Sequence, residues 1–501
     1  MDHVSLWQQT TSCRLPTVAL SASAEAVIVG GGLCGLLTAY RLLQRGVNDI
    51  VVMDAGDIAG GVTAHTTAKI TAQHGLCYQK LLQERGATAA AQYAAAAREA
   101  ERAFPTLIRQ LNIDCGYTPC PAAVYATDTD GACRLEQEAE ALARLQLPFT
   151  ADRTADLPFA VTAALHTTGG GYFHPLQFAY ALTDHLRRQG VTFCPRTAAV
   201  GLSEEAVVTT RGRVRTPVAV LTSHFPFLDM PGRYFMRIWQ ERAYVLAVAQ
   251  VKPPAEMYWG AGKHDLSLRP YPNGVLIGGG THRTGVAHSR HPLYQLRVRS
   301  APWYPDRRVV AGWSAQDCMT PDGVPYIGRY TQADQPHMAV YLATGFNKWG
   351  MTGSMTAAAI LAGSITGAAP SYAAVFSPAR HTATRKAFYV NNAQVLRHYI
   401  GGYARVPQES LASLHPGEGK LLTIDGKRVG AYRRRDGRVF LVKPTCPHMG
   451  CMLTWNAEEC SWDCPCHGSR FDYRGRLLNT PAHRPLTRYK LAEYFPRGRA
   501  Y

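Results

Sequence analysis

Three glycines near the start of the chain restrict its fold more than any other feature. Gly30, Gly32 and Gly35 form the pattern G-x-G-x-x-G within "EAVIVGGGLCGLLTAY", between a short apolar run and a stretch with helical spacing. The first glycine of such a motif permits a tight turn, the second lets the backbone approach a pyrophosphate, and the third lets the helix pack against the strand. Asp54 ends a second apolar run, "DIVVMD", where a carboxylate can bind a ribose hydroxyl. The N-terminal part is therefore predicted to be a βαβ unit that binds a dinucleotide.

The rest of the chain distinguishes FAD from NAD as that dinucleotide. The segment "VLIGGGTHRTG" at 275–285 looks like a second glycine motif, but Arg283 occupies the third glycine position and no helical pattern follows, so a strand end and a turn are predicted there. The segment "VYLATGFNKWGMTGSMTAAAILAG" at 340–363 predicts a strand, a glycine turn and a helix of small residues. The N-terminus of that helix would face an anionic flavin ring. We therefore expect FAD and no NAD(P)H domain.

Together with "WSAQDCMTPDGVPYIG" at 313–328, these segments resemble the glycine and D-amino-acid oxidase superfamily of flavoproteins over roughly residues 1–380. The resemblance implies an α/β dinucleotide-binding fold of the glutathione-reductase type for FAD, with an α+β substrate lobe. It also implies that the early glycines hold the ADP part of FAD, while the late "ATGF" turn lies beside the flavin ring. The flavin-side candidates that follow are Gly345, Phe346, Lys348 and Thr352. Lys348 is equally interpretable as a solvated loop lysine.

The segment "GVTAHTTAKITAQHG" at 61–75 is similar to a stretch of dimethylglycine and sarcosine dehydrogenases in which a histidine bonds covalently to FAD. His65 occupies the position of that histidine. Ala64 stands where that group has tryptophan, so the match is incomplete. Two hypotheses remain for His65, a covalent bond to FAD or a noncovalent contact with the flavin, and the altered flank favours the contact.

A second kind of redox site is predicted near the C-terminus. Cys446-x-His448 and Cys464-x-x-His467 supply two thiolates and two imidazoles. This donor set suits a Rieske-type [2Fe-2S] cluster, in which thiolates hold one iron and imidazoles the other, and it also suits a structural zinc ion. The surrounding residues favour the cluster, because a zinc site has no use for a further cysteine pair. Both Rieske sequence boxes are completed by Gly450, Cys451, Pro465, Cys466, Gly468 and Ser469.

The likeness to the Rieske proteins of respiratory chains leads to four expectations. Cys451 and Cys466 occupy the positions of a disulfide that clamps the two cluster loops together. Ser469 matches a residue whose hydroxyl hydrogen-bonds a cluster sulfur and raises the reduction potential. Phe471 stands where the high-potential proteins have a tyrosine, so one such hydrogen bond is missing and a lower potential is expected. The imidazoles of His448 and His467 are expected at an exposed tip.

Charge and composition narrow the range of partners and locations. No run of about 18 apolar residues occurs, so no transmembrane segment is expected. The first thirteen residues lack the features of a signal peptide, and eight of the 13 cysteines are scattered singly, so a cytoplasmic location is predicted. The net charge of +17 is concentrated after residue 380, where 20 Lys and Arg face 9 Asp and Glu. An acidic protein is a candidate partner for this basic part, and no nucleic-acid partner is expected.

With 501 residues the chain exceeds one ordinary core. We expect FAD-binding and substrate domains in residues 1–367, with FAD parts at about 24–80 and 315–367 and the substrate lobe interleaved. A linker at 368–412 and a small all-β Rieske domain at 413–501 are predicted to follow. Stretches such as "VAVLTS" at 218–223 are assigned to the substrate lobe. Helices are expected at 78–111, 174–190 and 384–400.

The chain as a whole resembles the Rieske-carrying branch of these flavoproteins. A flavin takes two electrons from a C–H bond, whereas the cluster carries one at a time. This combination predicts an FAD-dependent dehydrogenase that oxidises a small amine or amino-acid-like substrate and passes electrons singly to an acceptor protein. The alternative is a flavin and iron-sulfur relay or redox sensor without a substrate. Arginines that could bind a substrate carboxylate, each also interpretable as a surface residue, are Arg237, Arg242, Arg269 and Arg283.

Overall fold

The structure is a computed structural model, and it shows two compact units. It describes residues 4–228, 231–262, 264–286, 291–305, 307–382, 385–404, 410–424 and 426–490. Two pieces of the predicted domains, 405–409 of the linker and 491–501 of the Rieske domain, lie outside the described residues. No helix among the described residues is long and apolar enough to cross a membrane.

The two units do not follow the order of the sequence. The first unit contains Met1–Gly232, Ala243–Thr281 and Leu293–His381. The second unit contains the C-terminal stretch Thr382–Tyr501 together with two short segments from the middle of the chain. These two segments are Arg233–Arg242 and His282–Pro292. The second unit is therefore not a simple C-terminal appendage.

A six-stranded sheet forms the centre of the first unit, in the order β19-β20-β13-β1-β2-β9. Five strands are parallel and β19 pairs antiparallel to β20. Parallel strands are covered on both faces, which explains the unbroken apolar runs in β1 and β2. The strands span Ala26–Val29 (β1), Ile50–Met53 (β2), Thr192–Cys194 (β9), Val218–Leu221 (β13), Tyr326–Arg329 (β19) and Ala339–Thr344 (β20).

The position of β13 differs from the sequence prediction. "VAVLTS" was assigned to the substrate lobe, yet β13 pairs with β1 on one side and β20 on the other. A short β-branched run identifies a buried strand but carries no information about its sheet partner, which explains the error.

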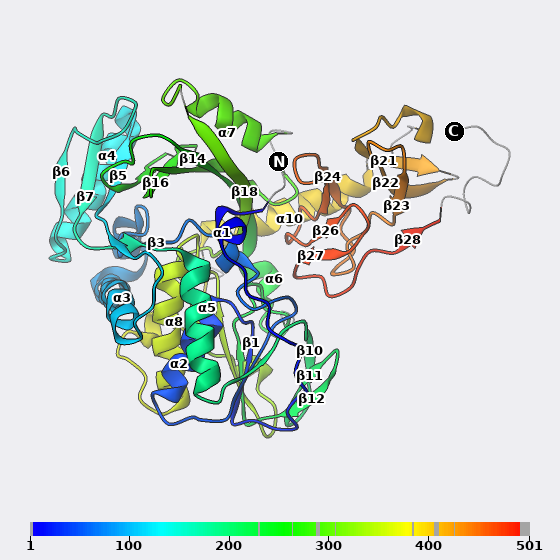
Figure 1. The fold of residues 1–501 in the computed structure, drawn as a ribbon, viewed down its shortest axis with the longest axis horizontal. Coiled ribbons are helices and arrows are strands. Elements are labelled where there is room, and N and C mark those ends of the chain that lie inside the picture. The colour runs from blue at the N-terminus through cyan, green and yellow to red at the C-terminus, as the bar shows by residue number, and fades with distance from the viewer. Residues whose placement is uncertain are drawn as a thin grey trace. The chain divides into compact units, whose positions relative to one another are not determined.

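Helices α2 (Leu33–Leu43), α5 (Pro175–Arg188) and α8 (Gly350–Ile365) lie together beside this sheet (Figure 1). Helix α8 consists mostly of small residues and is buried almost all round, so α2 can approach it closely. The predicted helix at 78–111 is α3 (Cys77–Gln110), which bends at Gly86, where φ is 80°. The predictions for α3, α5 and α8 are confirmed to within a few residues.

An eight-stranded sheet forms the second layer, in the order β18-β14-β17-β16-β15-β5-β7-β6. The segment 275–285 forms strand β17 and a following turn, as predicted, and not a nucleotide-binding loop. The strands span Ala122–Ala126 (β5), Thr150–Asp152 (β6), Ala163–Thr167 (β7), Trp239–Ala249 (β14), Met257–Gly260 (β15), Ser267–Tyr271 (β16), Gly274–Arg283 (β17) and Arg308–Met319 (β18).

Smaller elements complete the first unit. A three-stranded sheet has the order β3-β8-β4. Strand β3 precedes the long helix α3, β4 follows α3, and β8 follows α4 (Thr129–Arg144). A β-meander of three strands, β10-β11-β12, follows β9. The bounds are Leu6–Thr10 (α1), Lys69–Ile70 (β3), Thr118–Pro119 (β4), Gly171–Tyr172 (β8), Ala199–Leu202 (β10), Ala206–Thr209 (β11), Gly212–Arg215 (β12), Pro292–Ser300 (α7) and Ala373–Phe376 (α9).

Two antiparallel four-stranded sheets form the C-terminal part of the second unit, β21-β22-β23-β28 and β24-β25-β26-β27. The helix expected at 384–400 is present as α10 (Lys386–Ala404), within the stretch predicted to be a linker. Short helix α6 (Tyr234–Arg237) belongs to the same unit. The strands span Gly419–Ile424 (β21), Lys427–Arg433 (β22), Val439–Val442 (β23), Thr454–Asn456 (β24), Ser461–Asp463 (β25), Arg470–Asp472 (β26), Leu477–Asn479 (β27) and Arg488–Tyr489 (β28).

Candidate functional site

The glycine motif lies in the turn between β1 and α2. Gly30 has φ of 115°, and a Cβ there would lie 2.5 Å from the carbonyl oxygen of Thr222. A Cβ on Gly35 would lie 2.0 Å from the Gly30 carbonyl oxygen, so helix and turn touch at this point. A Cβ on Gly32 would meet only the Thr63 hydroxyl, at 3.3 Å. Two glycines are thus required by packing, whereas a Cβ on Gly32 would meet a single side-chain atom at the helix N-terminus.

The N-terminus of α2 suits a phosphate group. Gly32 is its N-cap residue and supplies no side-chain cap, and the Leu33 amide donates instead to the Thr63 hydroxyl at 3.0 Å. The positive end of the helix still favours an anion nearby. Asp54 lies beside the turn, where its carboxylate accepts hydrogen bonds from the Gly31 and Gly56 amides at 2.8 Å each. Burial raises the pKa of Asp54, and the two amide bonds oppose that shift. Each carboxylate oxygen keeps a lone pair for a ribose hydroxyl. These residues fit the ADP part of FAD.

The turn after β20 has the strained backbone common at functional sites. Gly345, Asn347 and Lys348 have φ of 74°, 51° and 72°. Phe346 packs against α8, where a Cβ on Gly353 would lie 2.6 Å from its ring. Lys348 is exposed, with its amine 3.5 Å from the Thr281 hydroxyl. The structure therefore leaves both interpretations of Lys348 open.

Thr352 connects this turn to the segment that contains His65. The Thr352 hydroxyl donates to the Thr71 carbonyl oxygen at 2.9 Å. His65 is half-buried at the end of a 3₁₀ turn, Val62–Ala64, with its Nδ1 2.8 Å from the Gly61 carbonyl oxygen. One hydrogen bond thus joins the start of α8 to the segment 61–75.

Two buried cations that the sequence analysis did not bring together lie in the same region. Lys69 on β3 contacts the hydroxyl of Ser267 on β16. Arg269 projects from the same face of β16 as Ser267, because the two residues are two positions apart. Its guanidinium lies 4.2 Å from the ring centroid of Tyr172 and 5.2 Å from that of Trp7. Trp7 in turn donates to the Thr66 carbonyl oxygen, one residue beyond His65.

Neither cation has a carboxylate partner among the described residues. Arg269 donates to the Phe173 carbonyl oxygen at 2.9 Å, while its Nε is buried without a hydrogen-bond partner. Burial, and then the charge of Arg269, lowers the pKa of Lys69 to about 7. Burial lowers the pKa of Arg269 to about 9, so this side chain stays charged at neutral pH. Two like charges buried together are costly unless an anion joins them.

The other three candidate arginines serve different purposes. Arg242 forms a buried ion pair with Glu459 at 2.6 Å, and Arg283 donates to backbone carbonyls of the second cluster loop. The guanidinium of Arg237 lies 5.0 Å from the ring centroid of Tyr234. All three belong to the second unit, whereas Arg269 belongs to the first. Arg242 and Arg283 are therefore engaged within the second unit, and Arg269 is the candidate for a carboxylate site within the first.

The two cluster loops of the second unit have matching backbone hydrogen bonds. Cys446 N donates to Cys451 O at 2.8 Å, and Gly450 N donates to Cys446 O at 2.9 Å. In the second loop, Cys464 N donates to Ser469 O at 2.8 Å and Gly468 N to Cys464 O at 2.9 Å. The two glycines have φ of 81° and 86°, a region in which other residues are strained. The sequence pattern C-x-x-x-G is thus explained by two equivalent tight turns.

The four predicted cluster ligands come together between these loops. The Cys464 thiol contacts Cys446 and lowers the pKa of Cys446 to about 6, while the pKa of Cys464 is raised well above its usual value. The imidazole rings of His448 and His467 lie 5.0 Å apart between centroids, at 89°. Burial lowers the pKa of His467 to about 3, and its Nδ1 is buried without a hydrogen-bond partner. Two adjacent thiols and two adjacent imidazoles, one of them held neutral, fit a [2Fe-2S] cluster of the Rieske type.

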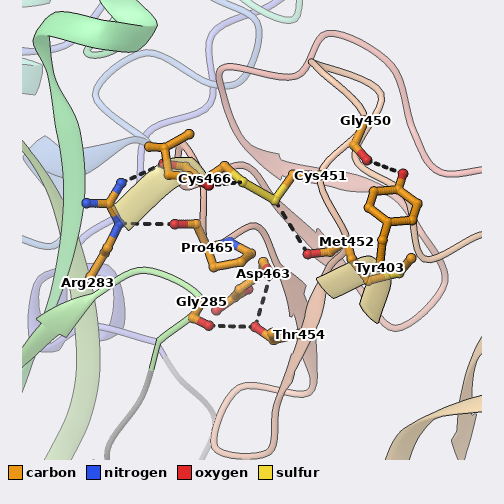
Figure 2. Close-up of a disulfide and its surroundings, with 11 residues drawn as sticks. Arg283, Gly285, Tyr403, Gly450, Cys451, Met452, Thr454, Asp463, Pro465 and Cys466 are labelled. Atoms are coloured by element: carbon orange, nitrogen blue, oxygen red, sulfur yellow. Dashed lines mark hydrogen bonds between the residues drawn. A yellow bond between two sulfur atoms is a disulfide. The ribbon is translucent and has the colours of Figure 1, made fainter. Parts of the chain in front are cut away.

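Cys451 and Cys466 are joined by a disulfide in the structure (Figure 2). The sulfur atoms of these two residues and of Cys464 lie within 4.8 Å of one another. Because two of the three are bonded to each other, this trio is not a metal site, but it shows that the disulfide adjoins a ligand. The bond ties one cluster loop to the other.

Ser469 and Phe471 follow the second loop. The Ser469 oxygen accepts from the Ala482 amide at 3.0 Å, which leaves its O–H to donate to the Cys446 sulfur. Phe471 on β26 is fully buried and offers no hydroxyl. The expected exposure of the imidazoles is wrong for His467, which is 4% exposed. Phe235, at 5.8 Å between rings, and Gln240 cover it, whereas His448 is half-buried.

Comparison with known proteins agrees with both sites. Residues 25–363 match the model of the family described as FAD dependent oxidoreductase. The chain belongs to that family. Residues 405–490 match the Rieske [2Fe-2S] domain. The Bacillus subtilis (strain 168) protein YhfW, whose name includes "Rieske 2Fe-2S iron-sulfur protein", is 32% identical over 97% of this chain and 97% of its own length.

Solved structures confirm the predicted fold class of this oxidoreductase. Glycine oxidase from Geobacillus kaustophilus has a TM-score of 0.61 and 18% identity, over 72% of this chain and 100% of that chain. L-proline dehydrogenase from P. horikoshii has a TM-score of 0.59 and 16% identity, over 72% and 98%. FAD and a Rieske [2Fe-2S] cluster are the cofactors that the two domains imply.

The glycine motif gives a test that separates packing from phosphate binding. We expect Gly35→Ala to lower the free energy of unfolding of the FAD-free protein by about 1–3 kcal/mol, because its Cβ meets the Gly30 carbonyl. Gly32→Ala should change that free energy by less than about 0.5 kcal/mol and still weaken FAD binding at least tenfold. Urea unfolding and FAD titration measure the two quantities. Unchanged FAD affinity in Gly32→Ala would contradict the assignment of this turn.

The two hypotheses for His65 are distinguished by denaturation. We expect acid precipitation to release all of the FAD, because a noncovalent contact is favoured for this histidine. Absorbance of the supernatant and flavin fluorescence of the denatured chain are the measurements. Fluorescence that stays with the parent chain and disappears in His65→Ala would show instead that His65 carries the flavin.

Proposed function

We propose that this protein is a dehydrogenase that oxidises an amine or amino-acid-like substrate bearing a carboxylate and delivers the electrons singly to an acceptor protein. When bound, FAD accepts two electrons at once, and the cluster supplies one-electron transfer. The observation that carries the proposal is the buried pair Lys69 and Arg269, since two cations without an acidic partner suit an anionic ligand. A relay without a substrate would have no use for such a pair.

Within this proposal Arg269 binds and orients the substrate carboxylate. Its position between Tyr172 and Trp7 fixes the guanidinium plane, and its unpartnered Nε is available as a further donor. Lys69, held against Ser267, supplies a second donor and takes up a proton when the anion arrives. Trp7 connects Arg269 to the backbone beside His65, so the proposed carboxylate site and the flavin-side segment are fixed with respect to each other.

The acceptor and location belong to the same proposal. An acidic one-electron carrier suits the basic C-terminal stretch, and His448, the less buried imidazole, is the proposed point of electron exit. A cytoplasmic location is supported by the cysteines of the first unit, all eight of which are free thiols.

The relay is tested with Cys464→Ser in the full-length protein. We expect this variant to lack iron and acid-labile sulfide but to keep FAD, because the cluster loses a thiolate ligand. An anaerobic screen of amines and amino acids should still bleach its flavin absorbance, whereas reduction of cytochrome c or a ferredoxin should fall at least tenfold. Cys460→Ser is the matched control, since Cys460 lies in the same unit and contacts the Tyr432 hydroxyl instead of the cluster loops.

Three outcomes would contradict the proposal. Equal acceptor reduction by Cys464→Ser and the parent would show that electrons bypass the cluster. Faster reaction of the reduced parent with dioxygen than with any carrier would indicate an oxidase. Bleaching by none of the amines and amino acids would favour the substrate-free relay.

The carboxylate site predicts a particular pH dependence. Lys69 has a pKa of about 7 in the folded protein, so its charged form is lost as the pH rises above 7. Because an anion binds the charged form, the affinity for benzoate should fall by up to about tenfold per pH unit above 7. Perturbation of the flavin absorbance by benzoate between pH 6 and pH 9 measures this affinity. Benzoate has no titration of its own in this range, which a substrate amine would have.

Lys69→Met is the control for that titration. Its benzoate affinity should be weak and independent of pH between pH 6 and pH 8, where Arg269 stays charged. Its free energy of unfolding should exceed that of the parent most clearly below pH 7, where the parent must bury a charged lysine. Between pH 7 and the ordinary lysine pKa near 10.4, Lys69 is neutral in the folded parent but charged in the unfolded chain. The stability of the parent therefore rises with pH in this range, and the advantage of Lys69→Met should shrink. A parent protein with pH-independent benzoate affinity would contradict the role of Lys69.

A further inference from the structure

The second cluster loop is fastened from outside by side chains that lie far away in the sequence. Its three successive carbonyl oxygens, those of Pro465, Cys466 and His467, each accept a hydrogen bond from such a side chain. Arg283 donates Nε to Pro465 at 3.0 Å and Nη2 to Cys466 at 2.7 Å (Figure 2). Gln240 donates Nε2 to His467 at 2.8 Å. The carbonyls of this tight turn have no strand partner, and these side chains satisfy them.

The second cluster loop packs against the segments around Gln240 and Gly285 so closely that no additional atom fits between them. A Cβ on Gly285 would lie 2.6 Å from the Pro465 nitrogen, and one on Gly468 would lie 2.7 Å from the Gln240 Cβ. The Gly285 carbonyl oxygen also accepts from the Thr454 hydroxyl at 2.8 Å (Figure 2). Backbone from the middle of the chain therefore packs directly against the loop that carries two of the cluster ligands.

Arg242 and Arg283 differ in whether a carboxylate neutralises their charge. Arg242 is neutralised by Glu459, which also pairs with Arg470 at 3.1 Å. Arg283 makes its described hydrogen bonds to neutral oxygens alone, the two loop carbonyls and two amides of α10. Those amides are Asn391, at 2.8 Å, and Gln394, at 3.2 Å. A guanidinium stays protonated in proteins, so Arg283 places a positive charge against the cluster loop. The charge of Glu241 acts on Arg283, but no carboxylate among the described residues forms an ion pair with it.

A positive charge near a cluster favours the reduced state, because reduction adds an electron. The effect is stronger in a partly buried position than in water. Phe471 has no hydroxyl, so a hydrogen bond that would raise the reduction potential is not made there. A positive charge near the cluster raises the potential and so acts against that loss. We propose that Arg283 is a positioning residue of the cluster, which fastens the second cluster loop and raises the reduction potential, with Gln240 as its uncharged partner in the fastening. This goes beyond the proposed function and does not depend on the identity of the substrate.

The charge is tested first by Arg283→Gln in the full-length protein carrying FAD and cluster. We expect iron content to be kept and the equilibrium between oxidised and reduced cluster to shift at least tenfold toward the oxidised form, which is about 59 mV for one electron. An EPR-monitored redox titration measures the shift. Arg283→Lys keeps the charge and should restore most of the potential, while its EPR line shape changes because two-point fastening is lost.

Two controls separate this role from a general effect of charge or of folding. Arg438→Gln removes a mostly exposed arginine of the same unit and should leave the potential unchanged. Asn391→Asp places a carboxylate against Arg283 and keeps the side-chain shape. The Met236 carbonyl keeps its partner there, because Asn392 also donates to it, at 3.0 Å. Asn391→Asp should lower the potential in the same direction as Arg283→Gln.

The variants together decide the proposal. If Arg283→Gln keeps its cluster with an unchanged potential, the charge role is overturned. If Arg283→Gln loses its cluster, the potential of Asn391→Asp becomes the test of the charge role. An unchanged potential in Asn391→Asp would then overturn that role. Gln240→Leu should keep the potential within twofold of the parent equilibrium but lose iron faster to a chelator. Iron loss at the parent rate would overturn the fastening role of Gln240.

Discussion

The close approach of helix α2 to the turn after β1 is the constraint on which the nucleotide half depends. A Cβ at Gly35 would lie 2.0 Å from the Gly30 carbonyl oxygen, so a larger residue would push the helix away from the sheet. The approach brings the N-terminus of α2 close to Asp54, which follows β2 and accepts from the Gly31 amide. It also allows α2 to pack against α8, whose N-terminus follows the strained turn after β20. The absence of a side chain at Gly35 thus sets how closely α2 can approach the sheet.

The cluster half depends on contacts of another kind. Its two loops are closed locally by matched backbone hydrogen bonds and joined by the disulfide. Local closure leaves three carbonyls of the second loop to be satisfied by Arg283 and Gln240. The ligands are therefore organised by residues next to them in sequence, whereas the side chains that fasten the second loop from outside come from elsewhere in the chain.

Local patterns in the sequence predicted much of this molecule. The glycine motif, helix α5, the strand and helix around the "ATGF" turn, and the tight turns at Gly450 and Gly468 all depend on neighbours within a few residues. The partner of β13 could not be predicted, because its apolar run would suit any buried sheet. The pairing of Lys69 with Arg269 and the burial of His467 depend on residues about 200 positions away, for which one sequence gives no signal. The assignment of each predicted residue to a cofactor remains a prediction.

The interleaving of the second unit has a consequence for the order in which the protein is made. Cys466 follows Arg283 by 183 positions, and Gln240 is still earlier. At roughly 5–20 residues per second, Arg283 leaves the ribosome about 10 to 40 seconds before the loop that it fastens. The first unit can begin to fold during that interval, while the second unit must wait for the end of the chain. Cluster insertion is therefore placed last by the topology, after the flavoprotein portion has been synthesised.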